Sequence, residues 1–187
     1  MTDVVWTAAL TAAAAIGGVL VTVIADGAKE QRRLGHERTV RAEERREAVA
    51  ARRASFELDN LIAAYDALWL LAREATKTHF VDSRAAETTD YGYGGTRLPE
   101  GTEADITVTS QAAKTIKLIL DGEVRTLALK AQRAMNRASL LGVEAKIHGR
   151  GPVSLAEGEA VHYEAVRLAD AALSAIAERI RQLVAEA

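Results

Sequence analysis

The sequence predicts an all-α protein in which an N-terminal transmembrane helix continues into a long charged helix, followed by an antiparallel three-helix bundle. The first observation is an uncharged, mainly apolar stretch at residues 4–25. The second is that the chain has only two prolines, Pro99 and Pro152, each near glycines that suit breaks between helices. The third is that apolar residues recur at spacings of three and four in three blocks, the period of amphipathic helices.

The first expected element is a membrane anchor within residues 1–27. Its 22 uncharged residues, 4–25, lie between Asp3 and Asp26. As a helix rising about 1.5 Å per residue, this stretch is long enough for a hydrocarbon core of about 30 Å. A signal peptide is disfavoured because no basic residue precedes the stretch, which is also longer than a usual signal core. A buried helix of a soluble bundle is the remaining alternative, although no polar stripe marks it.

The flanks of the anchor predict its orientation. Nine Lys and Arg residues follow within 29–53, and none precedes the stretch. By the positive-inside rule the N-terminus lies outside and the C-terminal region lies in the cytoplasm. Arginine outnumbers lysine 18 to 6, which is typical of a high-GC bacterium, so we expect the inner membrane. Lys29, Arg32 and Arg33 are near enough to the anchor to contact lipid headgroups.

Small residues within the anchor predict self-association. Ala13 and Gly17 are four residues apart, as are Ala14 and Gly18, so small side chains lie one turn apart on adjacent faces. Such spacing lets a second helix approach closely in a bilayer. We therefore expect a homo-oligomer.

Residues 28–55 are expected to form a solvated helical stalk. Five glutamates alternate with the nine basic residues, and Glu37 with Arg41 has the spacing of a helical ion pair. Nucleic-acid binding is not expected, because the acids interleave with the arginines, no aromatic platform accompanies them, and the whole chain has a net charge of −2.

Residues 56–187 are expected to form the cytosolic bundle. Its first helix continues from the stalk to about residue 77, the second covers about 110–141, and the third starts at a capping box made by Ser154 and Glu157. Each has an apolar stripe, and three such stripes can bury one another side by side. The stripe residues are, in order, Leu58, Leu61, Ile62, Tyr65, Leu68, Trp69 and Ala72; Ile116, Leu120, Leu127, Ala131, Ala134, Ala138 and Leu141; and Val166, Ala169, Leu173, Ile176, Ile180 and Leu183 or Val184.

A flexible loop is expected at residues 82–105, because this polar, Gly-rich segment has no helical stripe. Its Tyr91, Tyr93 and Leu98 have no evident place in the core, so we expect them to form a site for a protein partner. Deleting residues 85–95 should then barely alter thermal unfolding.

The search for chemistry yields no catalytic, cofactor or metal site. P-loop, GxGxxG, HExxH and GxSxG motifs are absent, and so is cysteine. His36, His79, His148 and His162 are far apart in sequence, although His162 near the start of the third stripe is placed to face the first helix. The run 149–151, Gly-Arg-Gly before a helix start, could capture an anion, but an interhelix turn accounts for the same residues.

In layout the chain resembles small single-pass bacterial membrane proteins of unknown function. The residues that carry this resemblance are 4–25 and 29–53, and it implies no activity. The sequence therefore predicts a membrane-anchored, non-enzymatic interaction or scaffold protein that contacts lipid, copies of itself and another protein. The alternative is a phage- or defence-related effector whose oligomerised anchors perturb the bilayer.

Overall fold

The computed structural model describes the backbone of residues 2–90, 92–94 and 106–186, and it describes side chains within these ranges except at 2–28, 30, 106 and 186. The regular elements in the described residues are four α-helices: α1 (Thr2–Thr88), α2 (Ile106–Ile116), α3 (Gly122–Ile147) and α4 (Leu155–Glu186). The all-α prediction is therefore confirmed. The chain divides into two compact units, Met1–Arg52 (unit 1) and Arg53–Ala187 (unit 2).

In the residues that the structure describes, none of the helices combines the length and the apolar character needed to cross a membrane. The anchor predicted at residues 4–25, with Ala13, Ala14, Gly17 and Gly18, lies where side chains are not described. It stays a prediction from the sequence.

The described side chains of unit 1 are solvated almost throughout. Leu34, Val40 and Val49 are all exposed. Glu37 lies 3.7 Å from Arg33 and 3.6 Å from Arg41, so the predicted pairing of Glu37 with Arg41 is confirmed. Pairs of this kind, one helical turn apart on a surface, each stabilise a helix by only about 0.3–0.5 kcal/mol.

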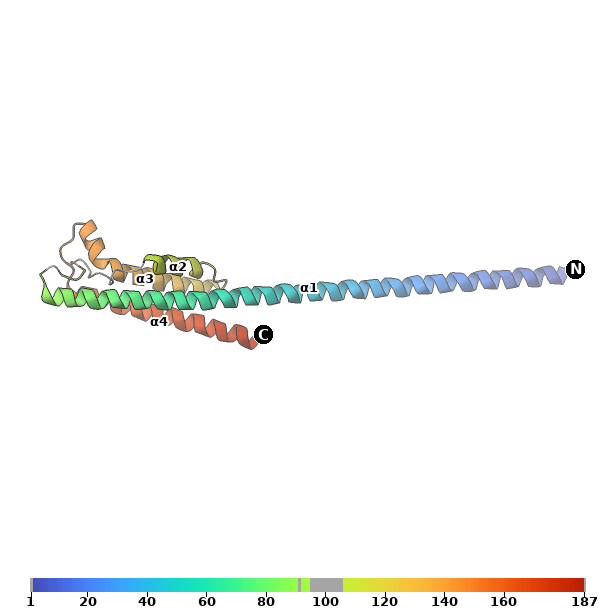
Figure 1. Ribbon diagram of the computed structural model, residues 1–187. Coiled ribbons are helices and arrows are strands. Elements are labelled where there is room, and N and C mark those ends of the chain that lie inside the picture. The colour runs from blue at the N-terminus through green and yellow to red at the C-terminus, as the bar shows by residue number, and fades with distance from the viewer. Residues whose placement is uncertain (1, 91, 95–105, 187) are drawn as a thin grey trace. The chain divides into compact units, whose positions relative to one another are not determined.

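The core of unit 2 is built from all four helices (Figure 1). Many of its buried residues are alanines, which permit close helix packing, with larger side chains between them. The fully buried large residues of this core are Leu61 and Leu68 on α1, Ile116 on α2, Ile119 before α3, Met135 on α3 and Ile176 on α4. The expected helical bundle is thus present.

Contacts at both ends of the α1–α4 pair show that these helices are antiparallel. Arg179 Nε lies 3.0 Å from Glu57 Oε1 at one end. At the other end, the rings of His79 and His162 stack with centroids 4.0 Å apart. The expectation that His162 faces the first helix of the bundle is confirmed.

The prediction of one helix at about 110–141 is wrong. The chain turns at residues 117–121, where Ile119 is buried and Leu120 is exposed. Asp121 then caps α3, because its Oδ1 accepts hydrogen bonds from the amides of Glu123 and Val124 at 3.0 Å. An Asp-Gly pair ahead of a helix start is the local signal for this break.

Two further boundaries differ from expectation. Helix α1 extends to Thr88, so the first residues of the loop predicted at 82–105 are helical, and Asp82 is buried. The start of α4 agrees better: the Glu157 amide donates to Ser154 Oγ at 3.2 Å, as the capping box requires. Within the predicted first stripe, Ile62 and Trp69 are exposed rather than buried.

Candidate functional site

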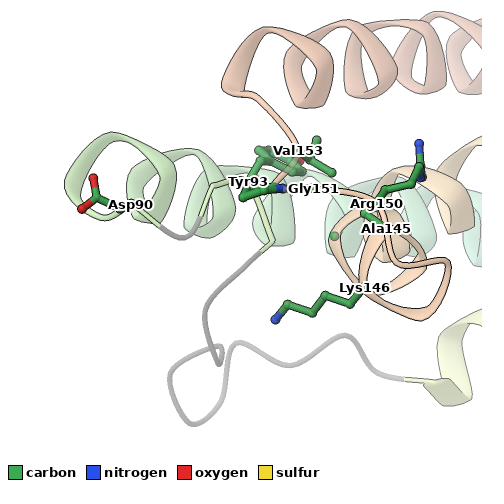
Figure 2. Close-up of a pocket in the computed structure, with 9 residues that line it drawn as sticks. Asp90, Tyr93, Ala145, Lys146, Arg150, Gly151 and Val153 are labelled. Atoms are coloured by element: carbon green, nitrogen blue, oxygen red, sulfur yellow. The ribbon is translucent and has the colours of Figure 1, made fainter.

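Tyr93 sits at the junction of α1, α4 and the turn between α3 and α4 (Figure 2). Gly92 and Gly94 on either side of it have positive φ values of 73° and 64°, which suit glycine. The Tyr93 amide donates to the Val153 carbonyl at 2.9 Å. The side chain is only 1% exposed, so the prediction that Tyr93 is an exposed loop residue is wrong.

Glycines on α3 and α4 leave room for Tyr93 and Gly94 to pack against these helices. A Cβ atom at Gly158 on α4 would lie 2.5 Å from the Tyr93 ring. A Cβ atom at Gly142 on α3 would lie 2.5 Å from the backbone of Gly94. Both distances are too short for a real contact, so Tyr93 and Gly94 occupy space that only glycine leaves open.

The Tyr93 hydroxyl reaches a pair of histidines. Its oxygen lies 2.9 Å from Nδ1 of His79, and Ser83 Oγ lies 3.4 Å from the same nitrogen. The His79 ring stacks on that of His162 with an interplanar angle of 5°. Nδ1 of His162 is buried without a hydrogen-bond partner among the described residues. We call His79, Asp82, Ser83, Tyr93 and His162 the junction cluster.

Both histidines of the junction cluster favour the neutral form. Burial, and to a smaller extent the nearby His79, lower the pKa of His162 to about 4. Burial also lowers the pKa of His79, against a smaller opposing effect from Glu159. In an unfolded chain both would titrate near their ordinary pKa of 6.5. Their neutral packing therefore stabilises the fold above that pH, and this stability is lost as pH falls from 6.5 toward 4.

Asp82 is the acidic member of the junction cluster. Burial raises the pKa of its carboxyl group from 3.8 to about 6. Burial and then the charge of Asp82 raise the pKa of the Tyr93 phenol above its ordinary value. At neutral pH the folded protein thus keeps an ionised carboxylate in a poorly solvated place, which opposes folding.

We expect Asp82→Asn to stabilise the protein at pH 7.5. Because the folded-state pKa is raised, ionisation of Asp82 destabilises the fold progressively as pH rises from 3.8 to 6. A shift of this size corresponds to at most about 3 kcal/mol. Urea unfolding should show the gain at pH 7.5 and a much smaller one at pH 4. The exposed Asp90→Asn is the control, and equal effects of both variants at pH 7.5 would contradict the assignment.

A pocket of about 250 Å³ adjoins Tyr93 (Figure 2), and neither histidine of the junction cluster lines it. Lys146 at the end of α3, Arg150 and Asp90 supply its charged groups. Arg150 Nη1 already lies 3.8 Å from Glu157 Oε1. The carboxyl end of α3 carries partial negative charge, which suits Lys146 and disfavours a bound anion. The turn reading of the run 149–151, with Gly149 at a φ of 62°, therefore accounts for this region.

A second hollow is a groove of about 430 Å³ between α3 and α4, which we call the α3–α4 groove. Its floor consists of Ala134, Ala160, Val161 and Leu168. Lys130, Arg133 and Arg137 rise from α3 along it, and all three are exposed. Its acid, Glu164, is held by Arg167 through two hydrogen bonds of 2.7 Å. The groove thus combines a small-residue apolar floor with excess positive charge.

The other predicted site residues are distributed as follows. Tyr91 and Leu98 lie outside the described residues. Lys29, Arg32 and Arg33 are exposed in unit 1, and their contact with lipid stays a prediction. His36 and His148 are not part of the junction cluster. No group of three or more His, Cys, Asp or Glu side chains is placed to hold a metal ion within the described ranges.

Sequence reasoning missed the junction cluster as a unit and the α3–α4 groove. His79 and Ser83 are four residues apart on α1, a spacing that places them on one face, but their partners come from elsewhere in the chain. Lys130, Arg133 and Arg137 have the 3-and-4 spacing of a single helix face, which was a signal available in the sequence. Comparisons with protein-family models, curated proteins and solved structures found no match to this chain.

Proposed function

We propose that the protein is a membrane-anchored, non-enzymatic interaction protein whose unit 2 binds a partner in the cytoplasm. The anchor, its orientation, its homo-oligomerisation and its lipid contacts are proposed from the sequence of residues 4–53. The observation that carries the interaction role is an exposed face on the part of α1 that belongs to unit 2, where three large apolar side chains lie with the charged Asp66 and Arg73 between them.

This α1 face is formed by Ile62, Trp69 and Phe80, with exposures of 46%, 50% and 68%. Ile62 and Phe80 are 18 residues apart, or five helical turns, and Trp69 is close to two turns from Ile62. The three side chains therefore share one side of the helix over about 27 Å. Aligned large apolar groups, especially a tryptophan, are typical of surfaces that bind a protein.

The junction cluster supports a structural role rather than catalysis. The polar atoms of His79, Tyr93 and Ser83 are directed at one another. The pocket beside Tyr93 is lined by neither histidine. The junction cluster joins the end of α1 to α4 and thereby stabilises the surfaces that a partner would contact.

One in-cell experiment tests the proposal. A photo-crosslinking amino acid replaces Trp69 in the full chain, and membranes are washed with alkaline carbonate after irradiation. We expect the chain in the carbonate-resistant fraction, with a crosslinked protein partner. The same amino acid at Gln111, an exposed residue of α2, is the control. Release of the chain by carbonate would refute the anchor, and equal crosslinking from position 111 would refute the role of the α1 face.

A further inference from the structure

We propose that the α3–α4 groove binds an acidic amphipathic helix of a protein partner. This inference rests on the proposed interaction function and names a chemistry for the partner at a second surface.

The cations of the α3–α4 groove come from α3, and its lining acid comes from α4. Three ion pairs lie within α4 or its preceding turn: Glu157 with Arg150, Glu164 with Arg167, and Glu178 with Arg181. No ion pair of this kind is found for Lys130, Arg133 or Arg137 within the described residues. The hydrogen bond and charge of Arg167, and more weakly the charge of Lys130, lower the pKa of Glu164. An incoming carboxylate would therefore meet three cations, and the acid that lines the groove, Glu164, is already held by Arg167.

The three cations of the groove are regularly spaced along α3. Lys130, Arg133 and Arg137 succeed one another at intervals of three and four residues on α3. They consequently span about 10.5 Å along one side of the helix. A partner helix with carboxylates at i, i+3 or i+4, and i+7 repeats over the same distance. The row of cations thus fits charges presented by a helix better than a single compact anion.

The floor of the α3–α4 groove is apolar. Ala134 and Ala160 have only small methyl side chains, and Val161 and Leu168 add apolar surface. Small residues in a groove allow larger side chains of a third helix to insert, as in ridges-into-grooves packing. An amphipathic helix supplies both parts, apolar residues for the floor and acids for the row of cations, which is the helix-in-groove mode of recognition.

The test uses the full chain in zwitterionic detergent and a labelled 18-residue helical peptide with leucines on one face and glutamates at matching i, i+3 and i+7 positions. A peptide of the same composition with a scrambled order is the matched control. We expect anisotropy to show binding of the amphipathic peptide alone, and binding should weaken as salt rises. The double variant Arg133→Glu, Arg137→Glu should lower affinity at least about tenfold.

Two controls make the result interpretable. Lys114→Glu with Lys117→Glu changes the net charge equally at exposed positions of α2 and the following turn, and it should leave peptide binding unchanged. Ala160→Trp fills the floor without altering charge and should also block the peptide. Equal binding by the scrambled peptide, or by the Arg133/Arg137 variant, would overturn the proposal.

A lipid is the other occupant that the experiment can detect. Labelling of the groove by a photoactivatable phosphatidylglycerol, lost in the Arg133/Arg137 variant and without any peptide binding, would overturn the assignment to a protein helix. Loss of the groove proposal is distinguishable from loss of the proposed function, because crosslinking from position 69 reports on a different surface. Crosslinks from position 69 that persist in the Arg133/Arg137 variant would leave the interaction role standing.

Discussion

Ile176→Asp is expected to unfold unit 2 at neutral pH. Ile176 lies on α4, has no exposed surface and belongs to the core shared by the four helices. An aspartate there would bury an unpaired carboxylate and remove a packed aliphatic side chain. Either change alone destabilises a core by several kcal/mol, so we expect a loss of about 4 kcal/mol or more. Urea unfolding of the full chain, followed by circular dichroism, measures it.

Leu120→Asp is the matched control. Both residues were assigned to apolar stripes from the sequence, but Leu120 is 38% exposed in the turn before α3. Its replacement by aspartate should therefore cost about 2 kcal/mol or less. Comparable losses in the free energy of unfolding for the two variants would show that Leu120 belongs to the core. The described packing of the turn at residues 117–121 would then be wrong.

Gly158→Ala is expected to destabilise the protein when position 93 is tyrosine and to stabilise it when position 93 is alanine. In the natural sequence the new Cβ atom would lie 2.5–2.7 Å from three atoms of the Tyr93 ring, which is held by His79 at its hydroxyl end. Such overpacking costs about 1–3 kcal/mol. With Tyr93→Ala the ring is gone, and alanine should instead stabilise α4 by up to about 1 kcal/mol through its higher helix propensity.

The measurement is a double-mutant cycle by urea unfolding, in which contacting residues typically couple by about 0.5–3 kcal/mol. Tyr93→Ala alone should cost about 3–5 kcal/mol, as for other buried aromatic residues. Gly35→Ala, at a helical glycine with no neighbour within 4 Å of the added atom, should have the same effect in both backgrounds. An equally unfavourable Gly158→Ala in the absence of the Tyr93 ring would refute the described contact.

The sequence predicted the parts of the fold that depend on local spacing. The α4 stripe placed Ala169 and Ile176 correctly in the core, and Ser154 marked the start of that helix. The same spacing placed His162 opposite the first helix of the bundle. The turn at residues 117–121 contains Leu118, Ile119 and Leu120, so the apolar spacing continues through it and concealed the break.

Tyr93 shows why the junction could not be predicted from the sequence. Its surroundings, Asp90 to Gly95, are rich in glycine and polar residues, which is typical of a solvated loop. The glycines that receive the tyrosine and its neighbour, Gly142 and Gly158, lie 49 and 65 residues further along the chain. The space left by a missing Cβ atom produces no pattern in the nearby sequence. Only the tertiary packing therefore shows which residues fill the space at each glycine. Because Tyr93 is buried, deleting residues 85–95 is now expected to destabilise unit 2.

The ion pair between Glu57 and Arg179 also indicates how the helices of unit 2 could be reconnected. These residues are 122 positions apart, yet Glu57 lies near the first residue of the unit and Arg179 near the end of α4. The two ends of unit 2 therefore meet at one pole of the bundle. Neighbouring ends are the usual condition for tolerating circular permutation or insertion into another polypeptide. A short linker from the end of α4 to Arg53 would leave the arrangement of the helices in space unchanged, and the chain could then begin and end elsewhere in the bundle. Unit 2 is therefore suited to circular permutation or to insertion into another protein.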